Sequence, residues 1–177
     1  MSAIHPIGQR VTCLEDPEGA DFVRKVRELL VGNEDIALEA ASNEELIILA
    51  QSEIDLAGPR GLLRAVFGDA IQFSAPAARL LYSDGWQQPI MGFRIAAPSS
   101  ILRLIETSLA LRGASITDVE VRDSGAVLRG QGPQAALIGY PRILSRLSRG
   151  SAHAAFWLSG YQPLWSYSNE TATCYQE

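Results

Sequence analysis

The stretch that decides the fold covers residues 88–131 and reads QPIMGFRIAAPSSILRLIETSLALRGASITDVEVRDSGAVLRGQ. Its apolar start predicts a strand over 88–97. Over 98–113, isoleucine and leucine recur every three or four residues between a proline and an arginine-glycine pair, which is typical of an amphipathic helix. Two further runs, 115–122 and 126–131, flank a glycine-bearing turn and predict a β-hairpin.

The residues on both sides of this stretch complete a repeated pattern. Residues 138–148 predict a second helix and residues 153–158 a last strand, so the order is strand, helix, strand, strand, helix, strand. The first half of the chain has the same order. Its predicted strands are 6–15, 35–41, 46–50 and 70–74, and its predicted helices are 20–31 and 53–67. In the second helix, Gly58-Pro59 should either kink the helix or divide its first turn from the rest.

This order predicts the fold class α+β, with two ferredoxin-like βαββαβ domains in tandem. In each domain, two right-handed crossovers place both helices on one face of an antiparallel sheet. We expect the first domain over residues 1–82, a linker over 83–87, and the second domain over 88–177 with a short tail. The expected core positions are Val23, Val26, Leu30, Ile47, Leu63 and Phe67 in the first domain and Ile101, Ile105, Leu109, Ile143, Leu147 and Phe156 in the second.

The composition is that of a globular protein. The 177 residues are 47% hydrophobic and 20% charged, which argues against disorder and against a coiled coil. No apolar run approaches the roughly 20 residues that cross a bilayer, so a cytoplasmic protein is predicted. The spacing of Cys13, Cys174, His5 and His153 does not suit a metal site, and we expect neither a metal nor a cofactor.

The sequence contains no recognisable catalytic site. It has no phosphate-binding loop, and Gly130-Gln131-Gly132-Pro133 does not open a helix as a dinucleotide fingerprint requires. The predicted third strands carry no aromatic residues, which argues against an RNA-recognition motif. His153 has no nucleophile partner, and Glu53 and Asp55 are expected to cap a helix. We therefore expect no catalytic residues and no enzyme activity.

One part of the chain has a net positive charge because it lacks acidic residues. The formal net charge is −5, yet residues 124–169 contain no Asp or Glu. Within that segment Arg142, Arg146 and Arg149 are spaced i, i+4 and i+7, so a continuous helix would place them on one face. Guanidinium groups arranged in this way can bind a phosphate backbone together. The alternative is an ordinary solvated helix face.

Two stretches resemble domains of a known family. The segment ELIILAQSEIDL at 45–56, followed by LLRAVFG at 62–68 and by Pro76, resembles the third domain of elongation factor G and of the related ribosomal protection proteins. A second set of motifs resembles the fifth domain of the same factors. This set comprises QPIM at 88–91, Pro98, RGASI at 112–116, IGY at 138–140, Leu144, LS at 147–148, Gly150, Phe156 and GYQP at 160–163.

The resemblance implies a ribosome-binding role for the second domain. In the family, the second helix of the fifth domain and the turn after it approach ribosomal RNA near the factor-binding centre. The matching positions are Ser145, Arg146, Ser148 and Arg149, next to Arg142. The family's GTPase domain, barrel domain and fourth domain have no counterpart in these 177 residues, so the resemblance does not extend to translocation.

Three functions are open at this point. The first is a translation-factor-related protein that binds the ribosome or ribosomal RNA. The second is a protein interaction or oligomerisation module without RNA binding, because a sheet with helices on one face leaves its other face free. The third is a fragment of a larger elongation factor G-like protein. No membrane partner and no small-molecule substrate are expected.

Overall fold

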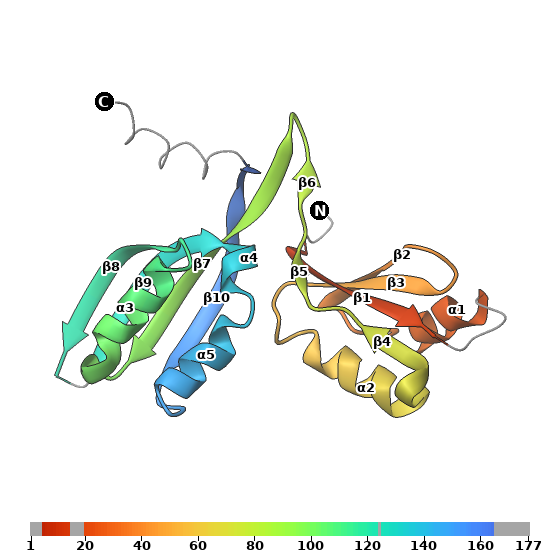
Figure 1. The fold of residues 1–177 in the computed structure, drawn as a ribbon, viewed down its shortest axis with the longest axis horizontal. Coiled ribbons are helices and arrows are strands. Elements are labelled where there is room, and N and C mark those ends of the chain that lie inside the picture. Colours follow the sequence, from red (N-terminus) through yellow and green to blue (C-terminus); the bar gives the residue numbers. More distant parts are fainter. Residues whose placement is uncertain (1–4, 15–19, 124, 165–177) are drawn as a thin grey trace. The chain divides into compact units, whose positions relative to one another are not determined.

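The chain forms two compact units, residues 1–78 and residues 79–177. The structure is a computed structural model that describes residues 5–14, 20–123 and 125–164. Each unit has its own antiparallel sheet (Figure 1). Within the described residues, no helix has the length and apolar character that crossing a membrane requires.

The first unit has the ferredoxin-like strand order. Its elements are β1 (Ile7–Cys13), α1 (Ala20–Leu29), β2 (Ile36–Ala40), β3 (Glu45–Ala50), α2 (Ala57–Phe67), the 3-10 turn η1 (Gly68–Ala70), β4 (Ile71–Phe73) and β5 (Ala77–Ala78). The strands lie in the antiparallel order β2-β3-β1-β4, and β5 also pairs with β1. This order confirms the predicted fold class for the first half of the chain.

The core of the first unit lies between its sheet and its helices. Three of the six expected core side chains are buried: Val26, Leu30 and Leu63. The other three are partly exposed: Val23, Ile47 and Phe67. Neighbouring residues of a strand face opposite sides of the sheet, and on β3 the side chains exposed by 1% or less are the alternating Leu46, Ile48 and Ala50. The prediction for Ile47 was therefore out of register by one residue.

The helix expected over residues 53–67 begins later than predicted. α2 starts at Ala57, and residues 51–56 form turns. The Asp55 carboxylate closes this segment, because its Oδ2 accepts hydrogen bonds from the Ser52 backbone N–H at 2.9 Å and from the Ser52 hydroxyl at 2.8 Å. Asp55 thus stabilises the turn before the helix rather than the helix N-terminus itself.

The second unit repeats the same order with longer strands. Its elements are β6 (Leu81–Tyr82), β7 (Trp86–Ala97), the 3-10 turn η2 (Ser99–Ile101), α3 (Leu102–Ala110), β8 (Ser115–Arg122), β9 (Gly125–Pro133), α4 (Gln134–Leu137), α5 (Tyr140–Leu147) and β10 (His153–Pro163). The antiparallel strand order is β10-β7-β9-β8, and β6 pairs with β7 (Figure 1). The second half therefore also has the predicted ferredoxin-like order.

The boundary between the units differs from the expected linker over 83–87. The structure divides the chain between Ala78 and Arg79. Tyr82 pairs with Trp86, so the expected linker contains the turn of the β6–β7 hairpin and the start of β7. β6 has only two residues, too few to show an apolar period in the sequence, which is why the pattern did not reveal this hairpin.

The core of the second unit lies between the sheet and the helices α3 and α5. Two of the six expected core side chains are fully buried: Ile105 and Leu109. Three are half-buried and pack against the same cluster: Ile101, Ile143 and Phe156. The sixth, Leu147, is partly exposed. The buried anchors of α5 are instead Tyr140 and Leu144, which shifts the buried face of this helix from the expected one.

Candidate nucleic-acid interface

The candidate interface is the outer face of α5. The helix predicted over 138–148 is divided into α4 and α5, because Gly139 has a φ of 75°, a conformation that glycine adopts without strain. Pro141 fits the first turn of α5, where a missing N–H costs no hydrogen bond. Tyr140 and Leu144 are buried and hold the helix on the sheet. The opposite face of α5 is exposed to solvent.

Three of the five residues expected to contact RNA lie on this exposed face: Arg142, Ser145 and Arg146. Arg142 and Arg146 are one helical turn apart, so their side chains leave the helix on the same side. Neither arginine has an ion-pair partner within the part of the chain that the structure describes. Their charges are therefore available to a phosphate backbone.

Ser148 occupies a different environment from the other expected contacts. It is only 6% exposed, and its hydroxyl oxygen accepts a hydrogen bond from the Ala152 backbone N–H at 3.1 Å. Its backbone carbonyl accepts a second bond, from the Ser151 hydroxyl, at 2.6 Å. Ser148 therefore connects the end of α5 to the segment before β10 and does not lie on the outer face.

Arg149 follows the helix instead of continuing it. α5 ends at Leu147, and Arg149 has a φ of 52°, in the left-handed region that costs a residue with a Cβ roughly 1 kcal/mol. The backbone N–H of Gly150 donates to the Ser145 carbonyl at 2.8 Å and closes the helix end. The three arginines thus occupy one helix face and the turn beyond it, not the single continuous helix face that the spacing predicted.

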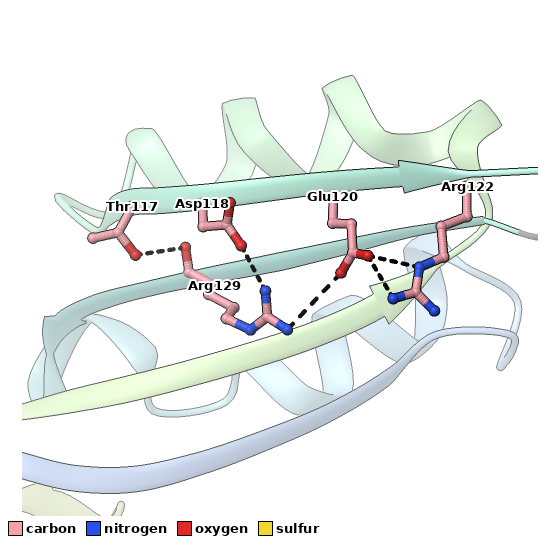
Figure 2. Close-up of polar contacts among 5 residues, drawn as sticks. All are labelled: Thr117, Asp118, Glu120, Arg122 and Arg129. Carbon is pink, nitrogen blue, oxygen red and sulfur yellow. Dashed lines mark hydrogen bonds and ion pairs between the residues drawn. The ribbon is translucent and has the colours of Figure 1, made fainter.

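Arg129 shows how strand pairing changes the charge pattern of the sequence. It lies in the acid-free segment of the chain, but β9 pairs with β8 and places it opposite Asp118. Its Nη1 lies 2.5 Å from Asp118 Oδ2, and its Nη2 lies 4.0 Å from Glu120 Oε2 (Figure 2). Arg122 also pairs with Glu120, at 2.5 Å. Arg129 is therefore neutralised locally, unlike the arginines of α5 in the described structure.

An apolar groove of about 640 Å³ runs between α3 and α5, where Ile143 and Leu147 of α5 line it. Leu104 and Leu111 in its lining are 56% and 84% exposed. Arg112 also lines it, donating from Nη1 to the Ala136 carbonyl at 2.5 Å and lying 5.4 Å from the centre of the Tyr140 ring. The sequence did not reveal this groove, because both leucines fit the apolar spacing of a buried helix face.

Two titratable residues of the second unit, Tyr140 and His153, lie in different environments. Burial raises the pKa of the Tyr140 hydroxyl above its ordinary value, and the positive charge of Arg112 opposes this shift only in part. Tyr140 is thus a neutral anchor of α5. His153 is exposed on β10. Among the described residues, no three His, Cys, Asp or Glu side chains gather closely enough to hold a metal ion.

Comparison with known proteins relates the second unit to translation factors. Residues 87–171 match the family model described as elongation factor G C-terminus. The mitochondrial ribosome-releasing factor 2 of Bos taurus is 31% identical over 77 residues, and that of Danio rerio is 27% identical over 77 residues. Each match covers 44% of this chain but 10% of the relative, so the chain spans about a tenth of the length of these curated relatives.

A solved structure supports the fold over nearly the whole chain. The crystal structure of a protein from Thermus thermophilus superimposes with a TM-score of 0.63 and covers 97% of this chain and 43% of that protein. Its sequence is 12% identical, so this likeness concerns the fold alone. The structural likeness and the family match together agree with two tandem α+β domains. The chain resembles the C-terminal domains of elongation factor G, and residues 87–171 are the region that matches the family model.

Proposed function

We propose that this chain is a non-enzymatic, ribosome-associated protein that binds ribosomal RNA near the factor-binding centre through its second unit. The observation that carries the proposal is the set of exposed arginines on and after α5, Arg142, Arg146 and Arg149, which have no ion-pair partner in the described residues. They lie inside the region that matches the elongation factor G C-terminus. The relatives' name, ribosome-releasing factor 2, points to the same partner.

The physical basis of the proposed contact is phosphate neutralisation. Each phosphate that an arginine contacts releases condensed counterion, so binding through α5 depends strongly on salt. Ser145 lies on the same exposed face and can donate its hydroxyl to a phosphate oxygen. Ser148 is buried and contributes through the helix end, not through direct contact.

The first unit has a supporting role in this proposal. Its motifs resemble the third domain of elongation factor G, and we propose that it is the counterpart of that domain. The matched region does not include a GTPase domain, and no phosphate-binding loop occurs in the sequence, which supports a function without nucleotide hydrolysis. We propose a cytoplasmic location as part of the same function.

Competition with elongation factor G tests the proposed site. Purified ribosomes are saturated with the labelled chain, and unlabelled elongation factor G is then added together with a non-hydrolysable GTP analogue. The proposal predicts that the factor displaces the chain, because both would occupy the factor-binding centre. Simultaneous binding of both proteins would place the chain elsewhere on the ribosome and refute the proposed site.

The second candidate function is protein interaction, and the groove between α3 and α5 favours it. Its exposed Leu104 and Leu111 offer apolar contacts that a partner or a second copy could cover. Analytical ultracentrifugation of the chain alone separates the two functions. A stable oligomer without affinity for ribosomes supports the interaction module, whereas a monomer that binds ribosomes supports our proposal. A fragment of a larger factor is compatible with either outcome.

A further inference from the structure

An exposed tryptophan lies on the open face of the second sheet, the face not covered by α3 and α5. Trp157 of β10 is paired with Gly92 of β7, which is paired with Gln131 of β9. Two residues further along β7, on the same face, Arg94 is paired with Ala155 of β10. Side chains of alternate β7 residues, such as Phe93, belong to the core on the other face.

Gly92 allows the tryptophan ring to lie flat on the sheet. A Cβ atom at Gly92 would stand only 2.6 Å from Cε2 and Nε1 of Trp157 and 2.8 Å from its Cζ2. The indole therefore covers the Gly92 backbone with one face of its ring. Trp157 is 49% exposed, as expected for a ring with one face covered and the other open to solvent.

Two polar residues share this face of the sheet with Trp157: Gln131 is the cross-strand partner of Gly92, and Arg94 is two residues from Gly92 on β7. Arg94 and Gln131 are exposed, and neither forms an ion pair or side-chain hydrogen bond among the residues that the structure describes. Arg94 is paired across the strands with Arg129, and such like charges repel. Because Asp118 and Glu120 neutralise Arg129 (Figure 2), Arg94 supplies the uncompensated charge of this row.

These features match the chemistry of an unpaired nucleotide. An open aromatic face stacks a nucleobase, a guanidinium binds the adjoining phosphate, and an amide can donate to and accept from a base edge. The third strands β3 and β9 carry no aromatic residue, so the stacking residue here comes from the last strand of the domain.

We propose that Trp157, Arg94 and Gln131 form a stacking platform for an unpaired nucleotide of single-stranded RNA. The base lies on the outer face of Trp157, and its phosphate lies on Arg94. The choice of RNA over DNA rests on the proposed function. The platform lies on the sheet and α5 on the opposite side of the domain, so the two surfaces can be tested separately.

Binding of a fluorescein-labelled oligouridine to the full chain, followed by fluorescence anisotropy, tests the platform. Trp157→Ala should weaken binding about 5- to 100-fold, the range that base stacking on one aromatic ring supports. Gly92→Ala keeps the tryptophan but forces its ring off the sheet, so it should also weaken binding. Trp86→Ala removes a tryptophan that is 54% exposed elsewhere in the same unit and should leave binding unchanged.

Further measurements distinguish base stacking on Trp157 from a loss of folding. Circular dichroism of each variant verifies the fold. A double variant, Trp86→Phe with Trp165→Phe, leaves Trp157 as the only tryptophan. Oligouridine should then quench the fluorescence emission of Trp157. Unchanged oligouridine affinity in Trp157→Ala overturns the proposal. So does an affinity for duplex RNA equal to that for oligouridine, or an affinity for oligothymidine higher than that for oligouridine. Burial of Trp157 by self-association of the chain also overturns it. Retained oligouridine binding in a chain that does not bind ribosomes would refute the proposed function and leave the platform standing.

Discussion

Replacing the three arginines of the α5 interface should weaken RNA binding while the protein becomes slightly more stable. The variant combines Arg142→Gln, Arg146→Gln and Arg149→Gly. The first two side chains are exposed and unpaired among the described residues, so each change should alter the free energy of unfolding by less than about 0.5 kcal/mol. Arg149 has a φ of 52°, and glycine there should stabilise the fold by up to about 1 kcal/mol.

The two effects are measured on the same preparation. A gain of about 1 kcal/mol raises the melting temperature of a unit of this size by roughly 4–8 °C. Loss of three phosphate contacts lowers the slope of log K against log salt by roughly 2 to 3. Thermal unfolding followed by circular dichroism gives the first value, and binding of ribosomal RNA over a salt series gives the second.

A matched control removes the exposed Arg27 of α1, which also has no ion-pair partner in the described structure. Arg27→Gln should leave both the salt slope and the affinity unchanged. If the triple variant binds ribosomal RNA with the original salt slope, the three arginines do not contact phosphates. If Arg27→Gln lowers the slope by a third of the change in the triple variant, the effect follows net charge alone and does not identify α5 as the contact.

Three further predictions concern the packing of the second unit. Ile105→Ala should lower the free energy of unfolding by about 2–5 kcal/mol, as measured in guanidinium titrations. Leu104→Ala, at a 56% exposed position, should change it by less than about 0.5 kcal/mol. Equal costs of the two changes would show that α3 does not bury the face that contains Ile105. Gly130→Ala would place a Cβ 2.2 Å from a backbone carbonyl oxygen of β8 and should lower the free energy of unfolding by about 1–3 kcal/mol. Gly160→Ala would place a Cβ with no atom within 4 Å and should leave that free energy unchanged. An unchanged stability of Gly130→Ala would contradict the close packing of β8 against β9. Burial raises the pKa of Tyr140, so as pH rises above about 10 the unfolded chain loses that proton first and the free energy of unfolding falls. Tyr140→Phe should make this alkaline decline shallower. An unaltered dependence of the free energy of unfolding on pH would argue against a buried hydroxyl.

The fold could be predicted because apolar spacing is a local signal. The strand and helix order of both units follows from residues close together in the sequence, and the ferredoxin-like strand order then follows from the handedness of crossovers. The division between the units could not be predicted in the same way. It depends on the pairing of Tyr82 with Trp86, and two-residue strands such as β6 carry no period.

The candidate site was predicted only where it coincides with helical spacing. Arg142 and Arg146 share an exposed helix face as expected. Ser148 and Arg149 differ because α5 ends at Leu147, and helix ends depend on backbone conformations that spacing does not encode. The same limit applies to charge, since the pairing of Arg129 with Asp118 depends on strand register.

The stacking platform was missed for a related reason. Gly92 and Trp157 are far apart in the sequence, and only the register of β7 and β10 brings them together. A search for aromatic residues on the third strand does not find a tryptophan on the last strand. The glycine gave no signal of its own, because its function is to leave space for the ring.

Co-sedimentation of the unmodified chain with purified ribosomes over a salt series shows whether the protein binds the ribosome at all. If the chain binds ribosomal RNA through α5, it pellets with ribosomes at low salt and is released progressively as the salt concentration rises, in proportion to the phosphates it contacts. The chain alone should remain in the supernatant. A chain that stays in the supernatant with ribosomes at every salt concentration does not bind the ribosome, which contradicts the proposed function.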